Sequence, residues 1–235
     1  MTTTRPSPGL LEVLGGLQDD FLATIPQVDP TTRVPWCGRW RVRDLVVHLA
    51  RIHHWAAGQA RRRQETPLGR GPFVLEELYA TCAAELRGTL AQLGPDAESW
   101  TLLGTGPASF WHRRQTHETL VHLWDLRTAG GQELAVEPAL WADTVDEVVT
   151  VMQPRQERMG RMEPLPAPLR LVADDADRAW LLGAPTVPAP SATVTGPAEA
   201  LALLLWGRTT PDDDRLTVSG DAGALVDALG RRLTP

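Results

Sequence analysis

The chain has 235 residues, of which 43% are hydrophobic and 22% charged, and this is enough apolar material for one large or two small folded domains. Its formal net charge of −6 argues against a nucleic-acid surface, which needs a clustered positive face. No apolar run approaches the roughly 18 residues of a membrane span, and the first residues lack the apolar core of a signal peptide. We therefore expect a cytoplasmic protein without nucleic-acid or membrane partners, and a monomer is compatible with the sequence.

The absence of certain reactive side chains also limits which reactions the protein could catalyse. All 23 basic residues are arginine, so a lysine Schiff base or a phosphate-binding lysine is excluded. The two cysteines, Cys37 and Cys82, form neither a CxxC spacing nor a disulfide framework, and we expect both to be buried thiols. Any sulfur chemistry is therefore expected to use a thiol from outside the protein.

Hydrophobic periodicity predicts helices through the first two thirds of the chain. Apolar residues recur every three to four positions, and proline or glycine breaks separate the segments. We predict helices over residues 10–25, 42–63, 74–93, 111–129 and 138–158, which together form a helical bundle in a first domain of residues 1–158.

The composition changes at residues 159–168, a segment rich in proline that we interpret as a linker. Short β-prone runs separated by turn residues follow it. The predicted strands cover 169–173, 178–182, 192–195 and 216–219, and the predicted helices extend from 197 to 206 and from 221 to 232. The chain is therefore expected to be a two-domain α+β protein whose second, small α+β domain spans residues 169–235.

One face of the helix predicted at 111–129 carries side chains that could bind a metal or take part in catalysis. Glu118, His122 and Asp125 are spaced by four and three residues, so they face the same way, and His48 lies on the helix predicted at 42–63. Imidazole and carboxylate are ligands that zinc and similar ions accept, and catalytic sites commonly use three such ligands. The pattern indicates a metal site, but a Glu/His pair at this spacing also occurs on solvated helices, and a lone histidine is commonly a core residue.

Several stretches resemble the mycothiol-dependent maleylpyruvate isomerase family over nearly the whole chain. They are VPWCGRWRVRDLVVHL at 34–49, RQTHETLVHLWD at 114–125, VTGPA at 194–198 and LWGR at 205–208. The resemblance implies a DinB-like four-helix bundle followed by a domain similar to sterol carrier protein 2 (SCP2-like). It also implies that His48, Glu118 and His122 bind zinc or another divalent metal, that Asp125 is catalytic, and that Arg208 reaches the site from the second domain.

The activity that this resemblance implies is an isomerisation that uses mycothiol as cosubstrate. A thiolate would add to the double bond of a maleylpyruvate-type cis-unsaturated acid, the new single bond would rotate, and elimination would give the trans acid. Two alternatives stay open, a mycothiol S-transferase acting on an electrophile and a non-catalytic, metal-stabilised binding module. Two residue roles also stay open, since Asp125 could instead orient a ligand histidine and Arg208 could cap its own helix.

Overall fold

The computed structural model describes residues 9–183 and 189–234. The chain divides into two compact units, residues 1–134 and 135–235, and both helices and sheet are present, as expected. The division falls earlier than the boundary expected after residue 158. Helix α5 (Pro138–Glu147) accounts for the difference, because it packs against helix α7 (Ala198–Leu205) of the second unit.

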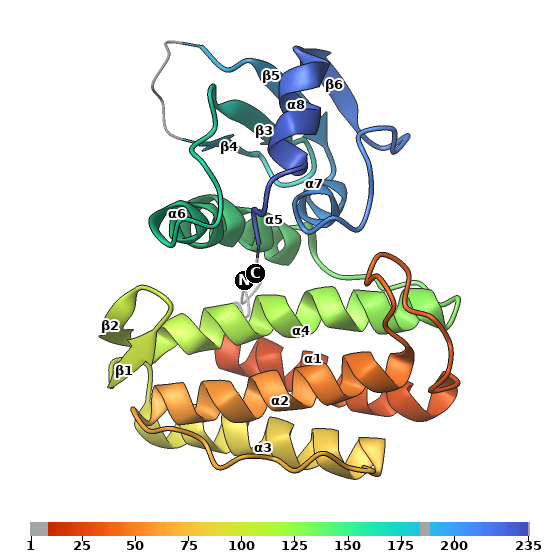
Figure 1. Cartoon of the computed structure of the whole chain (residues 1–235), viewed down its shortest axis with the longest axis vertical. Coiled ribbons are helices and arrows are strands. Elements are labelled where there is room, and N and C mark those ends of the chain that lie inside the picture. The colour runs from red at the N-terminus through yellow and green to blue at the C-terminus, as the bar shows by residue number, and fades with distance from the viewer. Residues whose placement is uncertain (1–8, 184–188, 235) are drawn as a thin grey trace, which may run out of the picture. The chain divides into compact units, whose positions relative to one another are not determined.

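The first unit is built on a bundle of four helices that lie close to their predicted positions (Figure 1). Helices α2 and α1 each pack against both α3 and α4, so the helices form a closed ring around one core. The four helices are α1 (Leu10–Thr24), α2 (Val42–Ala60), α3 (Leu75–Leu93) and α4 (Ser109–Ala129).

Helix α4 differs from the other three in what it buries. Polar residues such as Gln115, Thr119 and Asp125 are as buried on α4 as the apolar Leu120 and Leu123. Polar side chains rarely leave water without a partner or a function, so their concentration on one helix marks it as the functional element of the bundle.

The segment that leads into α2 is an ordered loop. It follows a short 3-10 helix, η1 (Ile25–Gln27), and an isolated bridge between Arg33 and Arg41 closes it. Gly38 has φ 61°, a left-handed value that glycine adopts without strain. Asp44 accepts a hydrogen bond from the Arg41 backbone N–H at 2.9 Å and so caps the start of α2, as its position near the helix start suggests.

The sequence patterns did not predict a small hairpin between α3 and α4. Strands β1 (Glu98–Thr101) and β2 (Gly104–Pro107) pair antiparallel across a two-residue turn. Gly104 takes φ 107°, which a side chain would disfavour. The strands are short and contain glycine, so no clear alternation of apolar and polar residues is present to reveal them.

The second unit contains a four-stranded sheet in the order β4-β3-β5-β6. β3 pairs antiparallel with β4 and parallel with β5, and β5 pairs antiparallel with β6. Helix α7 packs against β3 and β5, and helix α8 packs against β5. The remaining bounds are β3 (Leu169–Ala173), β4 (Arg178–Leu182), β5 (Ala192–Gly196), β6 (Thr217–Gly220) and α8 (Ala222–Leu229).

The helix predicted at 138–158 is interrupted. A π-helical turn, η2 (Val148–Met152), separates α5 from α6 (Gln153–Arg158). Pro154 has no backbone N–H to donate to the preceding turn, and the wider π turn accommodates this loss. None of the helices in the described ranges is long and apolar enough to cross a membrane.

Candidate metal centre

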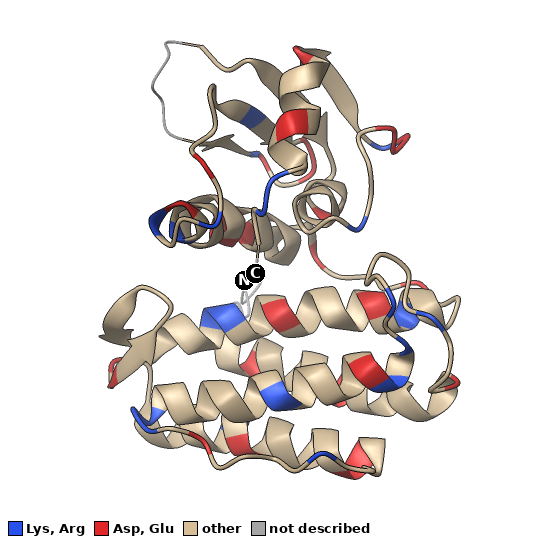
Figure 2. Cartoon of the chain, in the orientation of Figure 1, with Lys and Arg blue, Asp and Glu red and all other residues tan. Residues whose placement is uncertain are grey.

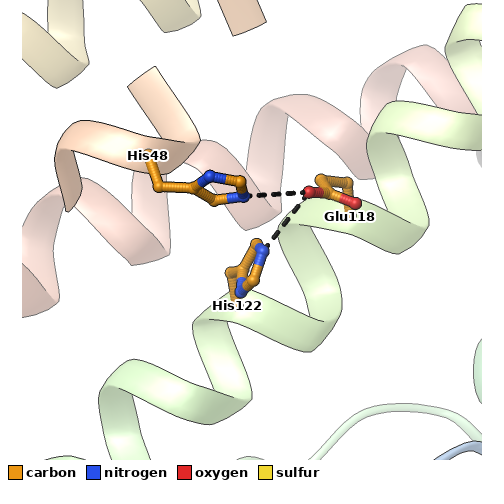
Figure 3. A group of neighbouring side chains, drawn as sticks. All are labelled: His48, Glu118 and His122. Carbon is orange, nitrogen blue, oxygen red and sulfur yellow. Dashed lines mark ion pairs between the residues drawn. The ribbon is translucent and has the colours of Figure 1, made fainter. Parts of the chain in front are cut away.

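Three predicted ligands meet where α2 faces α4 (Figure 3). Nε2 of His48 lies 3.5 Å from Glu118 Oε1, and Nε2 of His122 lies 3.3 Å from the same oxygen. One donor atom from each residue lies within 4.8 Å of the other two. Two nitrogens and one oxygen therefore converge on a single point, which the sequence of neither helix could show alone.

The bundle explains this convergence. Glu118 and His122 are one helical turn apart on α4, so they lie one above the other. Helix α2 packs directly against α4 and presents His48 to the same stripe. The rings of His48 and His122 meet edge to face, with centroids 5.1 Å apart.

Glu118 is ionised in this setting. Burial favours its neutral form, but the guanidinium of Arg114 and hydrogen bonds from His122 and His48 outweigh burial and hold the pKa of Glu118 well below its usual range. Arg114 forms an ion pair with the second carboxylate oxygen, Oε2, through its Nη2. Oε1 is thereby left to face the two histidines as a charged oxygen donor.

Asp125 lies behind the ligands. It is fully buried, and its Oδ2 accepts a hydrogen bond from Nδ1 of His122 at 2.9 Å. Burial lowers the pKa of His122, but Asp125 and Glu118 together raise it above the ordinary value. Cys37 completes the group, because its Sγ lies 3.6 Å from the same Asp125 oxygen.

Exposure is graded across the cluster. The side chain of His122 is 6% exposed, that of Glu118 13%, and that of His48 31%. Trp40 packs against His48 with ring centroids 4.7 Å apart, and both residues line a pocket of about 890 Å³ on the first unit. The cluster is therefore closed on the side of His122 and open to solvent on the side of His48.

This donor set fits a catalytic divalent metal. Two imidazoles and one carboxylate form a common three-ligand set for zinc, and a fourth position then remains for water or substrate. The hydrogen bond from Nδ1 of His122 to Asp125 directs Nε2 of the same ring at the cluster, where this nitrogen can exchange its proton for a metal, which is the arrangement that metal-binding histidines adopt.

Arg208 follows the end of α7 in the second unit, two residues after Trp206, which caps this helix. Its Nη1 donates a hydrogen bond to the carbonyl oxygen of Trp206 at 2.7 Å, and its guanidinium carbon lies 5.9 Å from the centroid of a Trp206 ring. Its backbone N–H reaches back to the carbonyl of Leu203. These contacts are local to the helix end.

Two residues of the site were not predicted. Arg114 pairs with Glu118 across four residues of α4, and that spacing alone could have suggested the pair. Cys37 was expected to be a buried thiol, yet it is half-buried and contacts Asp125. Its position depends on the loop before α2, whose path no periodicity encodes.

The fold and the cluster together define a protein with a His₂Glu centre in a helical bundle and a separate α+β unit. The chain belongs to the mycothiol maleylpyruvate isomerase family. The model of the mycothiol maleylpyruvate isomerase N-terminal domain matches residues 17–127, and that of the MDMPI C-terminal domain matches residues 139–227. The gap between the matches contains the division between the two units.

Individual relatives are more distant. An uncharacterized protein of Mycobacterium tuberculosis, Rv0738, is 26% identical over 151 residues, which cover 61% of this chain and 80% of that protein. The crystal structure of the mycothiol-dependent maleylpyruvate isomerase is similar with a TM-score of 0.68 and 17% identity, covering 94% of this chain and 98% of that one. A histidine-to-alanine mutant of that isomerase gives a TM-score of 0.67 at the same identity and coverage. These two structures show that this chain and the isomerase share a fold.

Proposed function

We propose that this chain is an enzyme that uses a low-molecular-weight thiol, most directly mycothiol, to isomerise a cis-unsaturated acid of the maleylpyruvate type. The observation that carries the proposal is the convergence of His48, Glu118 and His122 at the edge of an open pocket. Membership of the family supports the thiol, and the structural neighbours named for mycothiol-dependent maleylpyruvate isomerisation support the reaction.

In this proposal His48, Glu118 and His122 hold a divalent metal, with zinc as the first choice. When bound there, such an ion supplies Lewis acidity that lowers the pKa of a thiol toward neutrality. Asp125 fixes the orientation of His122 and favours its Nε2 as a donor, so its role is first of all that of a positioning residue. Arg114 keeps Glu118 charged and prevents it from rotating away.

The thiol is external because neither cysteine is suited to the chemistry. Burial, together with nearby Glu85, raises the pKa of Cys82 to about 11, so this residue is a thiol at neutral pH. Cys37 directs its sulfur at the carboxylate of Asp125, which disfavours a negative charge on that sulfur. The attacking sulfur therefore comes from the cosubstrate.

The proposed reaction needs no net oxidation. The sulfur adds to one carbon of the double bond, the electron pair moves into the adjacent carbonyl, and the former double bond can then rotate. Return of the electron pair expels the thiol and leaves the trans acid. A guanidinium suits the carboxylate or enolate of such a substrate, and we propose Arg208 as a candidate for this role on the basis of the family resemblance.

The test is a thiol-dependent turnover assay. Purified protein with mycothiol and maleylpyruvate should convert the cis acid to the trans acid without consuming the thiol, and His122→Ala should abolish the conversion while the protein stays folded. Mycothiol consumed with chlorodinitrobenzene, without isomerisation, would favour the S-transferase. A protein that holds metal but catalyses neither the isomerisation nor the S-transfer, and whose metal does not respond to added thiol, would favour a structural site.

A further inference from the structure

A second feature of the first unit lies outside the metal ligands. The pocket that opens beside His48 is lined by twelve residues, four of them arginines: Arg39, Arg43, Arg51 and Arg70. Arginine makes up only 23 of the 235 residues of the whole chain, and that chain is acidic overall. The pocket is therefore a local concentration of positive charge on a negative protein.

Three segments bring these arginines together. Arg43 and Arg51 lie on the exposed face of α2 that also carries His48, Arg39 belongs to the loop before α2, and Arg70 to the segment between α2 and α3. Figure 2 shows blue residues on all three segments. The fold, and not one sequence motif, builds the cluster.

Among residues 9–183 and 189–234, few acidic side chains neutralise the cluster. Asp44 is the one acidic residue among the lining residues, and it lies 3.8 Å from Arg43 while its other oxygen caps α2. Arg51 donates to the backbone carbonyl of Gly69 at 3.2 Å. Across the described ranges, the structure gives the side chains of Arg39 and Arg70 no ion pair. Clustered guanidinium groups repel one another, so a site that keeps four of them suits an anionic ligand.

Apart from His48 and Asp44, the other residues that line the pocket are apolar. Trp40, Val47 and Phe73 are among its lining residues, and Trp40 also packs on His48. An anion with a carbon skeleton would place that skeleton against these side chains and its charged groups against the arginines. A carboxylate engages one or two guanidinium groups at a time, so four arginines suit a ligand with two anionic groups better than one with a single group.

We infer that this arginine pocket binds the carboxylates of a substrate with two or more acidic groups and directs its carbon skeleton toward the metal centre. The inference rests on the proposed function for its substrate and adds to it the site at which the acid is recognised. It assigns to the first unit an anion site built from Arg39, Arg43, Arg51 and Arg70, separate from Arg208.

Binding is tested directly by calorimetry, without thiol or turnover. The probes are maleate, a cis four-carbon dicarboxylate, and isocrotonate, which has the same cis skeleton but one carboxylate. Two double variants remove charge from the pocket: R39Q with R70Q, where no ion pair is broken, and R43Q with R51Q on α2. The matched control is R63Q with R232Q, which removes the same charge from two exposed arginines outside the pocket.

Wild-type protein should bind maleate about tenfold more tightly than isocrotonate, and each pocket double variant should weaken maleate binding by about tenfold or more. The control should match wild type, and metal content should be the same in all. Pocket variants that keep wild-type maleate affinity, or equal affinity for the two probes, would overturn the inference. Turnover is assayed separately, so the two proposals can fail independently. If the wild type shows thiol-dependent activity but the pocket variants bind maleate as the wild type does, only the pocket is rejected. If the pocket variants lose maleate binding but the wild type shows no thiol-dependent activity, only the proposed function is rejected.

Discussion

Nδ1 of His122 and Oδ2 of Asp125 are 2.9 Å apart in a fully buried contact. The carboxylate accepts, so Nδ1 of His122 carries a proton and Nε2 of the same ring is directed at Glu118, where a bound metal would replace the proton on Nε2. This one hydrogen bond connects the bundle core to the candidate metal centre, because it sets both the tautomer and the direction of the ring.

Loss of this hydrogen bond should weaken metal binding. Asp125→Ala is expected to reduce zinc affinity about 10- to 100-fold, because His122 loses the partner that fixes its donor nitrogen. Competition with a chromophoric chelator measures the change. Asp96→Ala, at an exposed position between α3 and β1, is the control and should bind zinc as wild type does. Unchanged affinity in Asp125→Ala would show that Asp125 acts in some other way.

The two cysteines should differ in reactivity. Cys82 is buried with a pKa of about 11, so only about one in ten thousand of its side chains is a thiolate at pH 7. In native protein, iodoacetamide should label half-buried Cys37 before Cys82, as peptide mass spectrometry can show.

Neither cysteine should be needed as a nucleophile. Cys37→Ser is expected to keep thiol-dependent turnover, because a serine hydroxyl can also donate to Asp125. A Cys37→Ser protein that is folded and metal-bound but inactive would mean that the reactive sulfur belongs to the protein.

His53 should make the bundle sensitive to acid. Burial lowers the pKa of this histidine to about 4, although its Nδ1 bonds Gln115 at 2.8 Å. Between the unfolded pKa of about 6.5 and about 4, the unfolded chain binds this proton and the folded chain does not, so stability falls as pH falls. The full loss below pH 4 is roughly 3 kcal/mol from this residue.

Urea unfolding of metal-free protein across this pH range tests the assignment. His53→Asn, whose amide can still donate to Gln115, should flatten the slope by up to about 1.4 kcal/mol per pH unit. His54 provides the control. Burial lowers its pKa, but hydrogen bonds to Glu85 and Thr66 raise it overall, so His54 is protonated in both the folded and the unfolded chain below about pH 6.5, and His54→Asn should leave the slope between pH 4 and 6.5 unchanged. An unaltered slope in His53→Asn would contradict the buried neutral histidine.

Arg208→Ala separates two roles for that residue. If Arg208 binds substrate, kcat/KM should fall about ten- to a hundredfold with metal content unchanged, and Arg208→Lys should restore little. If its bond to the Trp206 carbonyl is its whole role, the variant should lose only a little stability, as a thermal melt would show, and keep its activity.

The sequence was sufficient to predict the parts of the structure that depend on local patterns. Helix periodicity placed α1 to α4, and a spacing of four placed Glu118 above His122. The β1–β2 hairpin, the π turn before Pro154 and the earlier division of the two units were not predicted, because each depends on backbone geometry or on packing between distant segments. The same is true of Cys37 beside Asp125 and of the arginine pocket, whose members come from three separate segments.

The central claim is that His48, Glu118 and His122 hold a metal that an external thiol can approach. The most direct measurement is the absorption spectrum of the cobalt-substituted protein during titration with mycothiol. We predict a sulfur-to-cobalt charge-transfer band that saturates at one thiol per metal and is absent from a His48→Ala, His122→Ala double variant, which should also lose the metal. Stoichiometric cobalt retained by the double variant, or a wild-type spectrum that thiol leaves unchanged, would contradict the account.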